Sequence, residues 1–286
     1  MSGSEQSDAQ LEQKASRLVA ILRGYGSVAV AFSGGVDSAV VARAAHEALG
    51  DRAVAVTAVS PSVAQAELDD ARRVAQLIGI RHVLIQTAEI EKAEYRQNAP
   101  DRCYHCKTEL YTKLESILDQ LGVQVIANGA NVDDQGDWRP GMVAAREHRV
   151  RSPLIEAGLR KADVRALARY WGLPVWDKPA APCLASRIAY GVEVTPDRLR
   201  MIEAAEAFLR GLGFRELRVR LPEPGTARIE LPVPELARLL SVRDQVVREL
   251  KAIGFKFVTV DLEGLRSGSL NALIEPEALL RLGNRQ

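Results

Sequence analysis

The chain has 286 residues, and its 47% hydrophobic and 26% charged residues exclude a disordered or fibrous protein. Its 38 Lys and Arg against 37 Asp and Glu give a net charge of +1. That balance argues against nucleic-acid binding over the whole surface, although a local basic groove stays compatible with it. The length suits one large domain or two ordinary ones.

The three cysteines are too few, and odd in number, for a disulfide framework. We therefore expect a cytoplasmic protein whose thiols are available for metal binding or chemistry. The polar N-terminus lacks the apolar stretch of a signal peptide, and apolar runs such as 54–59 are only as long as strands. We expect no membrane partner.

Strands and helices alternate through the first half of the sequence. This alternation predicts an α/β fold with a parallel sheet covered by helices on both faces and joined by right-handed crossovers. The predicted strands cover residues 27–32, 53–59, 82–86 and 123–129, and the predicted helices cover residues 11–25, 37–49, 65–78, 107–121 and 161–171.

The order of elements changes after residues 189–195. We place a domain boundary there, with one domain over residues 1–190 and a smaller α+β domain over residues 191–286. The second domain is predicted to hold helices over 196–212 and 234–253, and strands over 216–221, 227–231 and 256–261.

The hexapeptide SGGVDS follows the first predicted strand and opens a helix, which is the arrangement of a phosphate-binding loop. Gly34 and Gly35 let backbone N–H groups approach an anion, and Ser33 and Ser38 add hydroxyl donors beside the positive end of the helix. Asp37 can cap the helix or hold Mg²⁺ beside the phosphates. The alternative, an ordinary corner between strand and helix, would not require the full hexapeptide.

This hexapeptide resembles the PP-loop of ATP pyrophosphatases, enzymes that adenylate a substrate oxygen and release pyrophosphate. The resemblance implies a doubly wound parallel sheet of the adenine-nucleotide hydrolase-like type over residues 1–190. It also implies that the loop residues named above bind the β- and γ-phosphates of ATP. The segment GANVDD after the fourth strand is similar to a family segment near ATP and its metal, which implicates Gly129 and Asp133.

The cysteines lie in two motifs, Cys103 and Cys106 in RCYHCK and Cys183 in KPAAPCLASR. Three thiolates can hold a [4Fe–4S] cluster with one iron open. Zinc would need a fourth ligand, and His105 lies badly for it between the paired cysteines. A CxxC disulfide relay with Cys183 as a separate nucleophile is a third reading, and three unligated thiols are a fourth.

The segments RCYHCKTELY and DKPAAPCLASRIAYG closely resemble the LarE family of ATP-dependent sulfurtransferases, which help to make the nickel-pincer nucleotide cofactor. The likeness runs from the PP-loop to the C-terminal strands. In that family the cysteine matching Cys183 gives up its sulfur and becomes dehydroalanine in members that have it alone. Members that also have a CxxC resemble cluster enzymes that pass on a cluster-bound sulfide. We therefore predict a catalytic [4Fe–4S] cluster on Cys103, Cys106 and Cys183.

The resemblance implies pyridinium-3,5-biscarboxylic acid mononucleotide as the substrate, adenylated by ATP with Mg²⁺ and then attacked by sulfur to give a thiocarboxylate. Lys178 before the cysteine could neutralise a phosphate or lower a thiol pKa. The sequence departs from the family at Leu221 and Pro222, where members often carry His after RVR. The residues assigned to substrate binding are Ser186, Arg187, Glu206, Arg218 and Arg220, with Glu230 as a further acid of open role.

Two alternatives stay open: a PP-loop tRNA thiolase, and Cys183 as a sacrificial sulfur donor without a cluster. A non-catalytic nucleotide-binding module would keep the loop but would release no pyrophosphate. We expect no stable nucleic-acid partner. We also expect a homo-oligomer, by family analogy a hexamer, and a protein that donates sulfur.

Overall fold

The computed structural model describes residues 7–136, 140–179 and 182–266, and the chain divides into two compact units. The first unit comprises residues 1–88 and 103–181, and the second comprises residues 89–102 and 182–286. The division falls at residues 181–182, before the boundary predicted at residue 190, and the assignment of residues 89–102 to the second unit was not predicted. Hydrogen bonds between this segment and distant backbone create the difference, and no local pattern encodes them.

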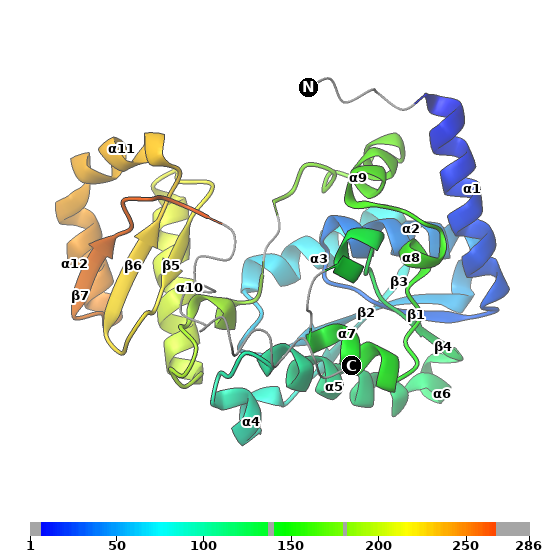
Figure 1. The fold of residues 1–286 in the computed structure, drawn as a ribbon, viewed down its shortest axis with the longest axis horizontal. Helices are drawn as coiled ribbons and strands as arrows, with labels where there is room; N and C mark the ends of the chain where they lie inside the picture. Colours follow the sequence, from blue (N-terminus) through cyan, green and yellow to red (C-terminus); the bar gives the residue numbers. More distant parts are fainter. Residues whose placement is uncertain (1–6, 137–139, 180–181, 267–286) are drawn as a thin grey trace. The chain divides into compact units, whose positions relative to one another are not determined.

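The first unit is built on a four-stranded sheet in the order β3–β2–β1–β4 (Figure 1). All neighbouring strands in it are parallel. The apolar runs that predicted buried strands form its centre, since β1 and most of β2 are buried. The strands are β1 (Val28–Ala31), β2 (Ala53–Val59), β3 (Arg81–Gln86) and β4 (Val125–Ala127).

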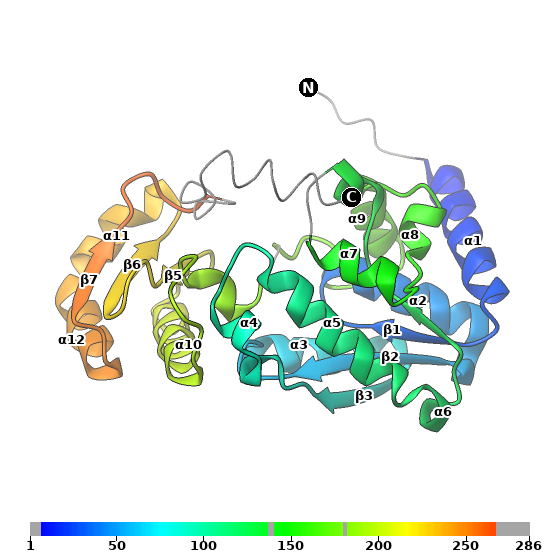
Figure 2. The same cartoon turned by 60° about the horizontal axis from the view of Figure 1, so that its bottom comes forward.

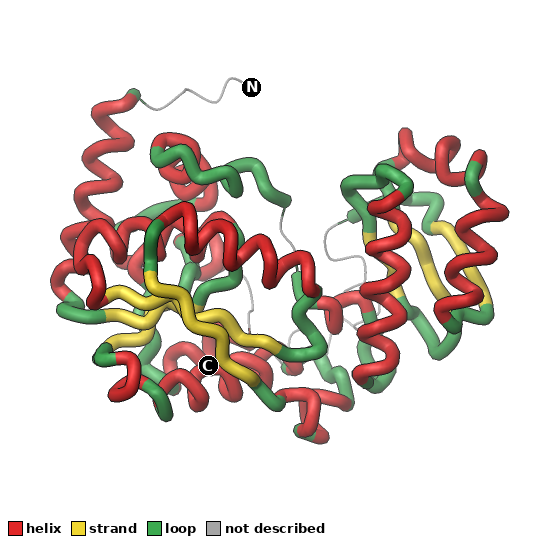
Figure 3. Tube along the Cα trace, turned by 180° about the vertical axis from the view of Figure 1, so that it is seen from behind, coloured by secondary structure: helices red, strands yellow, loops and turns green. Residues whose placement is uncertain are grey.

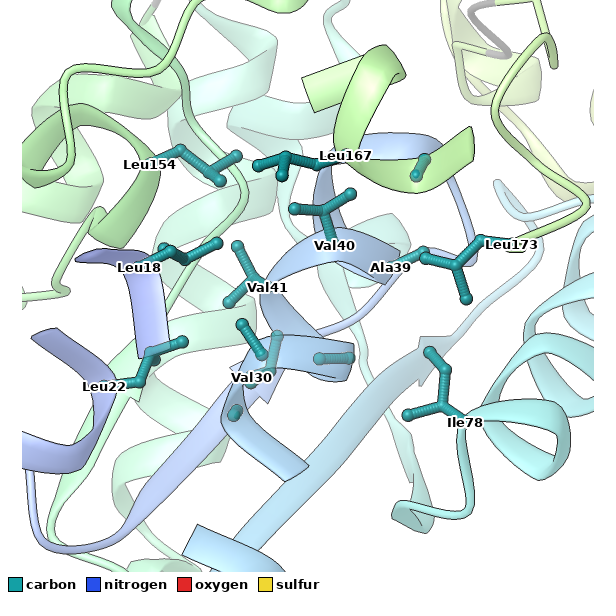
Figure 4. Packing of buried hydrophobic residues seen from close by; sticks show 14 of the residues in the cluster. Leu18, Leu22, Val30, Ala39, Val40, Val41, Ile78, Leu154, Leu167 and Leu173 are labelled. Atoms are coloured by element: carbon teal, nitrogen blue, oxygen red, sulfur yellow. The ribbon is translucent and has the colours of Figure 1, made fainter. Parts of the chain in front are cut away.

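Helices cover both faces of this sheet (Figure 2). On one face the helices α1 (Asp8–Gly24), α2 (Val36–Leu49), α3 (Gln65–Ile78), α8 (Pro153–Glu156) and α9 (Lys161–Tyr170) share a hydrophobic core. Figure 4 shows how α2 lies at its centre, with Val40 and Val41 between Leu18 of α1 and Leu167 of α9. On the other face lie α5 (Arg102–Glu115), α6 (Leu118–Leu121) and α7 (Pro140–Glu147).

The doubly wound α/β class predicted from the sequence is thus confirmed. Two details differ. The helix predicted over 107–121 begins earlier, at Arg102, and is interrupted before α6. The helix α7, whose Ala144 and Ala145 are buried, was not predicted.

The second unit has a three-stranded sheet in the order β5–β6–β7 (Figure 3). The strands β5 (Arg218–Arg220) and β6 (Thr226–Glu230) are antiparallel, whereas β6 and β7 (Phe257–Val260) are parallel. The helix predicted over 234–253 is broken at Val242. The helices are α4 (Ala93–Arg96), α10 (Pro196–Gly211), α11 (Leu236–Ser241) and α12 (Arg243–Ile253).

Among the described helices, none combines the length and apolar character that a membrane span requires.

Candidate active site

The predicted phosphate loop connects the carboxyl end of β1 to the first turn of α2. In the strand order, β1 lies between β2 and β4, so this is the point where chain connections leave in opposite directions and where ligands bind in open α/β sheets. Gly35 is the N-cap of α2 and makes no side-chain cap, which leaves the first N–H groups of the helix to a ligand.

The loop is held in shape by its own serines. Ser38 Oγ accepts from Ser33 N at 3.2 Å and donates to the Gly35 carbonyl at 3.1 Å. The two serine hydroxyls lie 3.2 Å apart. The predicted loop is therefore preshaped at the start of α2, and its contact with phosphates stays a prediction.

Gly34 is required by both backbone geometry and packing. Its φ of +71° is left-handed, and a Cβ there would lie 2.7 Å from Ala71 Cα on α3. Because that neighbour is backbone, no side-chain rotation relieves the clash.

We expect Gly34→Ala to destabilise the protein by at least about 2 kcal/mol, through left-handed strain and forced displacement of α3. The matched variant is Gly35→Ala, since Gly35 has φ −80° and its Cβ would meet only Ser33 Oγ, at 3.3 Å. That change should cost at most about 1 kcal/mol, the loss in going from Gly to Ala at an N-cap. Urea unfolding of both variants gives the comparison, and equal losses would contradict the packing argument.

The segment after β4 closes against the loop. A Cβ on Gly129 would lie 2.9 Å from Ser38 N, so only glycine allows this approach to the start of α2. Asn131, which is buried, donates from Nδ2 to Asp37 Oδ1 at 3.2 Å. Close packing against α2 thus explains why residue 129 is a glycine, and its contact with ATP stays a prediction.

Lys161 is a site residue that the sequence analysis missed. Its Nζ lies 2.5 Å from Asp37 Oδ2, and the two residues are 124 positions apart in the chain. Asp133 accepts from the backbone N–H of Lys161 at 2.8 Å and from Arg160 Nη1 at 3.2 Å. The predicted site residue Asp133 therefore fixes the start of α9 beside the loop.

Two cations, Arg160 and Lys161, stand at the N-cap and first position of α9. The positive end of a helix dipole disfavours cations there, and the carboxylates of Asp37 and Asp133 offset this cost by pairing with them. The start of α2 lies nearby through the Lys161–Asp37 pair. The arrangement suits a polyphosphate, and the Asp37 carboxylate oxygens are of the type that Mg²⁺ prefers.

His82 on β3 contacts the strand that leads into the loop. Its Nε2 lies 2.8 Å from Thr57 Oγ1, which in turn donates to the Phe32 carbonyl at 2.7 Å. Burial and, less strongly, the charge of Arg72 lower the pKa of His82.

The pKa shift of His82 predicts a loss of stability in mild acid. An unfolded chain binds the imidazole proton near pH 6.5, whereas the folded chain binds it only at lower pH. Between the two values the unfolded state holds more protons, so the free energy of unfolding falls as the pH drops below 6.5. Urea unfolding against pH should show this slope reduced in His82→Gln, and an unchanged slope would exclude His82 as its source.

The CxxC pair lies in the first turns of α5. Cys103 is exposed and Cys106 is partly exposed, and their spacing of three puts them on one face of the helix. They belong to the first unit, and Cys183 belongs to the second. Within the described residues, no group of three or more His, Cys, Asp or Glu side chains is gathered as a metal site. The three-cysteine cluster therefore stays a prediction.

Lys178, which precedes Cys183, is a structural anchor in the first unit. Its Nζ donates to Glu67 and Asp70 of α3, both at 2.7 Å. Burial alone would lower the pKa of Lys178, but the hydrogen bonds and charges of these two carboxylates outweigh it and raise the pKa. Lys178 is thus a charged residue that fixes its segment to α3 through ion pairs with two carboxylates.

Cys183 is the N-cap of a 3₁₀ turn, Leu184–Arg187, in the second unit. Arg187 holds this turn from within: Nη1 donates to the carbonyls of Pro182 and Cys183 at 2.5 and 3.2 Å. The other side of the guanidinium grips Glu206 of α10 in a bidentate pair at 2.9 and 3.3 Å. Of the residues assigned to substrate binding, Arg187 and Glu206 thus also build the site.

A second buried ion pair lies beside it, on β5 and β6. Arg220 Nε lies 2.9 Å from Glu230 Oε2, and Arg220 Nη1 donates to the Ser186 carbonyl at 2.8 Å. Glu206 is 1% exposed and Glu230 is fully buried, so these acids balance the arginines around them and do not face solvent.

Arg218 differs from its two neighbours. Its Nη1 donates to the Arg266 carbonyl at 3.2 Å, and among the described residues no carboxylate forms an ion pair with it. Burial and the positive charges of Arg220 and Arg187 lower the pKa of Arg218. An anion binds most favourably to a guanidinium whose surroundings carry more positive than negative charge.

The sheet and its serine- and glycine-bearing loop define a nucleotide-binding enzyme of the PP-loop class. The sequence profile of the NAD synthase family matches residues 14–112. Pyridinium-3,5-bisthiocarboxylic acid mononucleotide synthase of Lactiplantibacillus plantarum is 39% identical, over 92% of this chain and 95% of its own length. The chain therefore belongs to the family of this synthase, the LarE family, and is an ATP-dependent sulfurtransferase.

Two further relatives differ in how much of the chain they match. An uncharacterized protein of Synechocystis is 44% identical, over 92% of this chain and 99% of its own length. A tRNA-specific 2-thiouridylase of Azorhizobium caulinodans is 33% identical, over 53% of this chain and 48% of its own length. The likeness to the tRNA enzyme thus covers about half of each protein.

Proposed function

We propose that this chain uses ATP to transfer sulfur to the ring carboxylates of pyridinium-3,5-biscarboxylic acid mononucleotide. The activity named for the Lactiplantibacillus relative, which aligns with 92% of the chain, supports this substrate. The tRNA-specific relative aligns with only 53% of the chain, which favours a small molecule over RNA. A homo-oligomeric state, a cytoplasmic location and a separate sulfur-donor protein are further parts of the proposal.

The first step activates a carboxylate. A carboxylate oxygen of the substrate forms a bond to the α-phosphorus of ATP, and the bond from that phosphorus to the departing pyrophosphate breaks. Residues 33–38 bind the β- and γ-phosphates through backbone N–H groups, and Lys161 offsets their charge. The carboxylate of Asp37 would hold Mg²⁺, which would supply further charge neutralisation.

The second step forms the carbon–sulfur bond. Where Cys183 itself is the sulfur donor, its thiolate attacks the acyl carbon, and AMP leaves with the electron pair of the broken carbon–oxygen bond. Removal of the Cα proton of the same residue then breaks its Cβ–S bond. The products are the thiocarboxylate and a dehydroalanine at this position, and no oxidant or reductant is consumed.

The presence of Cys103 and Cys106 leads us to propose a [4Fe–4S] cluster on the three cysteines. A sulfide carried by this cluster would then be transferred, and the sulfur of Cys183 would not be consumed. The donor chemistry suits a cluster because three thiolates can hold one and leave an iron open. The described residues gather no three-ligand site, so this part of the proposal stands on the cysteine pattern alone.

The observation that carries the substrate proposal is the set of arginines in the second unit. Arg187 and Arg220 each have a buried carboxylate partner, whereas Arg218 has none among the described residues. The surplus charge suits the phosphate or a carboxylate of a mononucleotide. The turn that begins at Cys183 is bonded to this set through Arg187 and Arg220, so an anion there lies close to the sulfur.

We expect Arg218→Ala to raise the KM for the mononucleotide about 10- to 100-fold, the loss of a charge-assisted hydrogen bond, with the KM for ATP unchanged. Arg218→Lys should recover part of the loss. Arg215→Ala is the matched control, because Arg215 is exposed three residues away. Steady-state kinetics with each substrate varied would test it, and an equal rise in both KM values would contradict a substrate-specific role.

The test of the function is an anaerobic reaction with ATP and pyridinium-3,5-biscarboxylic acid mononucleotide, in which pyrophosphate and thiocarboxylate are both measured. Pyrophosphate release should depend on the mononucleotide. About four iron atoms per chain would support the cluster. An iron-free chain that loses the mass of one H₂S would support Cys183 as the donor. Absence of substrate-dependent pyrophosphate release would reject the proposal.

A further inference from the structure

The excursion of residues 89–102 is part of the second unit, although both neighbouring stretches of chain belong to the first. It contains α4 and ends at Arg102, the first residue of the CxxC helix α5. The proposed function gives this segment no role. Its contacts are concentrated on one target, the stretch of chain just after Cys183.

Asn98 is the centre of these contacts. Its amide Nδ2 donates to the carbonyls of Ile188, Ala189 and Val192, at 3.2, 2.7 and 3.1 Å. The side chain is fully buried, and the backbone has a φ of +55°, a left-handed conformation that asparagine adopts more readily than most residues other than glycine. The buried amide therefore fixes residues 188–192 against this segment.

Arg102 extends the same network towards the sulfur site. Its guanidinium, 5% exposed, donates from Nη1 to Asn98 Oδ1 and, at 2.9 Å, to the Ala185 carbonyl. Ala185 lies in the 3₁₀ turn whose N-cap is Cys183. Arg102 is also bonded in the chain to Cys103. Arg102 is therefore connected to both cysteine motifs, to that of Cys183 by a hydrogen bond of its side chain and to the CxxC motif through the backbone.

The turn is held from its other side by residues already placed in the site. Arg187 binds the Cys183 carbonyl, and Arg220 binds the Ser186 carbonyl. The carbonyl of Ala185, between them, is bound by Arg102. Three guanidinium groups thus fix successive parts of one short turn, and two of them belong to the site itself.

We propose that Arg102, oriented by Asn98, is a positioning residue for sulfur transfer. It sets the conformation of the turn that carries Cys183 and makes that conformation depend on how α5 begins. The hydrogen bonds of its guanidinium to Asn98 and to the Ala185 carbonyl place its effect on the second step of the reaction, and we expect adenylation to be unaffected. The inference rests on the proposed function, and its thiol readout below is independent of it.

The test uses Arg102→Gln in the full-length protein. In a single turnover with ATP and the mononucleotide, we expect the burst of pyrophosphate to stay within about twofold of wild type, while the rate of thiocarboxylate formation falls about 10- to 100-fold, the cost of a displaced reacting group. Without any substrate, alkylation of Cys183 by iodoacetamide, followed by peptide mass spectrometry, should become at least about threefold faster because the turn opens.

Three further variants separate positioning from folding. Arg102→Lys retains a charged donor and should recover part of the transfer rate. Asn98→Gly removes the amide but suits the left-handed backbone, so it should fold and reproduce the uncoupling. Arg96→Gln is the matched control, since Arg96 lies on the same segment and its side chain pairs only at 3.6 Å with exposed Glu193. It should leave both readouts at wild-type values.

A folded Arg102→Gln or Asn98→Gly variant with wild-type transfer and alkylation rates would overturn the inference. So would an equal fall in pyrophosphate release and transfer, which would indicate a general structural role. Failure of the wild type itself to release pyrophosphate with the mononucleotide would reject the proposed function instead. In that case the alkylation rates still decide whether Arg102 sets the turn.

Discussion

Replacing Cys183 with serine will lower thiocarboxylate formation at least about a thousandfold, because a serine hydroxyl is a far weaker nucleophile than a thiolate at neutral pH. The fold will tolerate the change. Cys183 is an N-cap with extended backbone, φ −58° and ψ 159°, and serine is among the residues that N-caps favour. The contact that Arg187 makes is to the backbone carbonyl and survives the substitution.

The informative readout for Cys183→Ser is pyrophosphate. Adenylation uses residues of the first unit, so the burst of pyrophosphate should persist while thiocarboxylate is lost. Loss of both products would contradict a role for Cys183 confined to sulfur transfer. Cys103→Ser and Cys106→Ser are the companions: both should lose iron if a cluster carries the sulfide, and both should behave as wild type in a single turnover if Cys183 is consumed.

The central sheet of the first unit could be predicted because each element carries its own local signal. The strand over 53–59 and the helix over 65–78 occur at the residues predicted. The strand is a short apolar run, and the helix ends where Gly79 takes a left-handed φ of +79°. Where the local signal was absent the prediction was wrong, as at Val242, where no Gly or Pro marks the break between α11 and α12.

The phosphate loop could be predicted because its residues are consecutive. Lys161 could not, because its partner Asp37 lies 124 positions away and nothing near the lysine in sequence marks it. The burial of Glu206 and Glu230 could not be predicted either, because it depends on arginines brought in from other elements. Asn98 and Arg102 belong to this class as well.

Lys161→Ala is expected to slow pyrophosphate release about 100- to 1,000-fold, the usual effect of removing one preorganised charge from a transition state. The lysine stands at the start of α9, next to Arg160, and its Nζ reaches a carboxylate in the first turn of α2. When nucleotide binds, the phosphates offer this cation a higher charge than Asp37 does.

The same change should have little effect on stability, which is what makes it a test of chemistry. Lys161 and Asp37 are 37% and 26% exposed, and an ion pair of that exposure contributes less than about 1 kcal/mol. Lys14→Ala is the matched control. Lys14 of α1 pairs at 2.6 Å with Asp163 of α9, the helix that begins at Lys161, and it lies outside the loop. It should release pyrophosphate at the wild-type rate. If the two variants lost activity equally, the effect of Lys161 would lie in anchoring α9, and another cation would have to serve the phosphates.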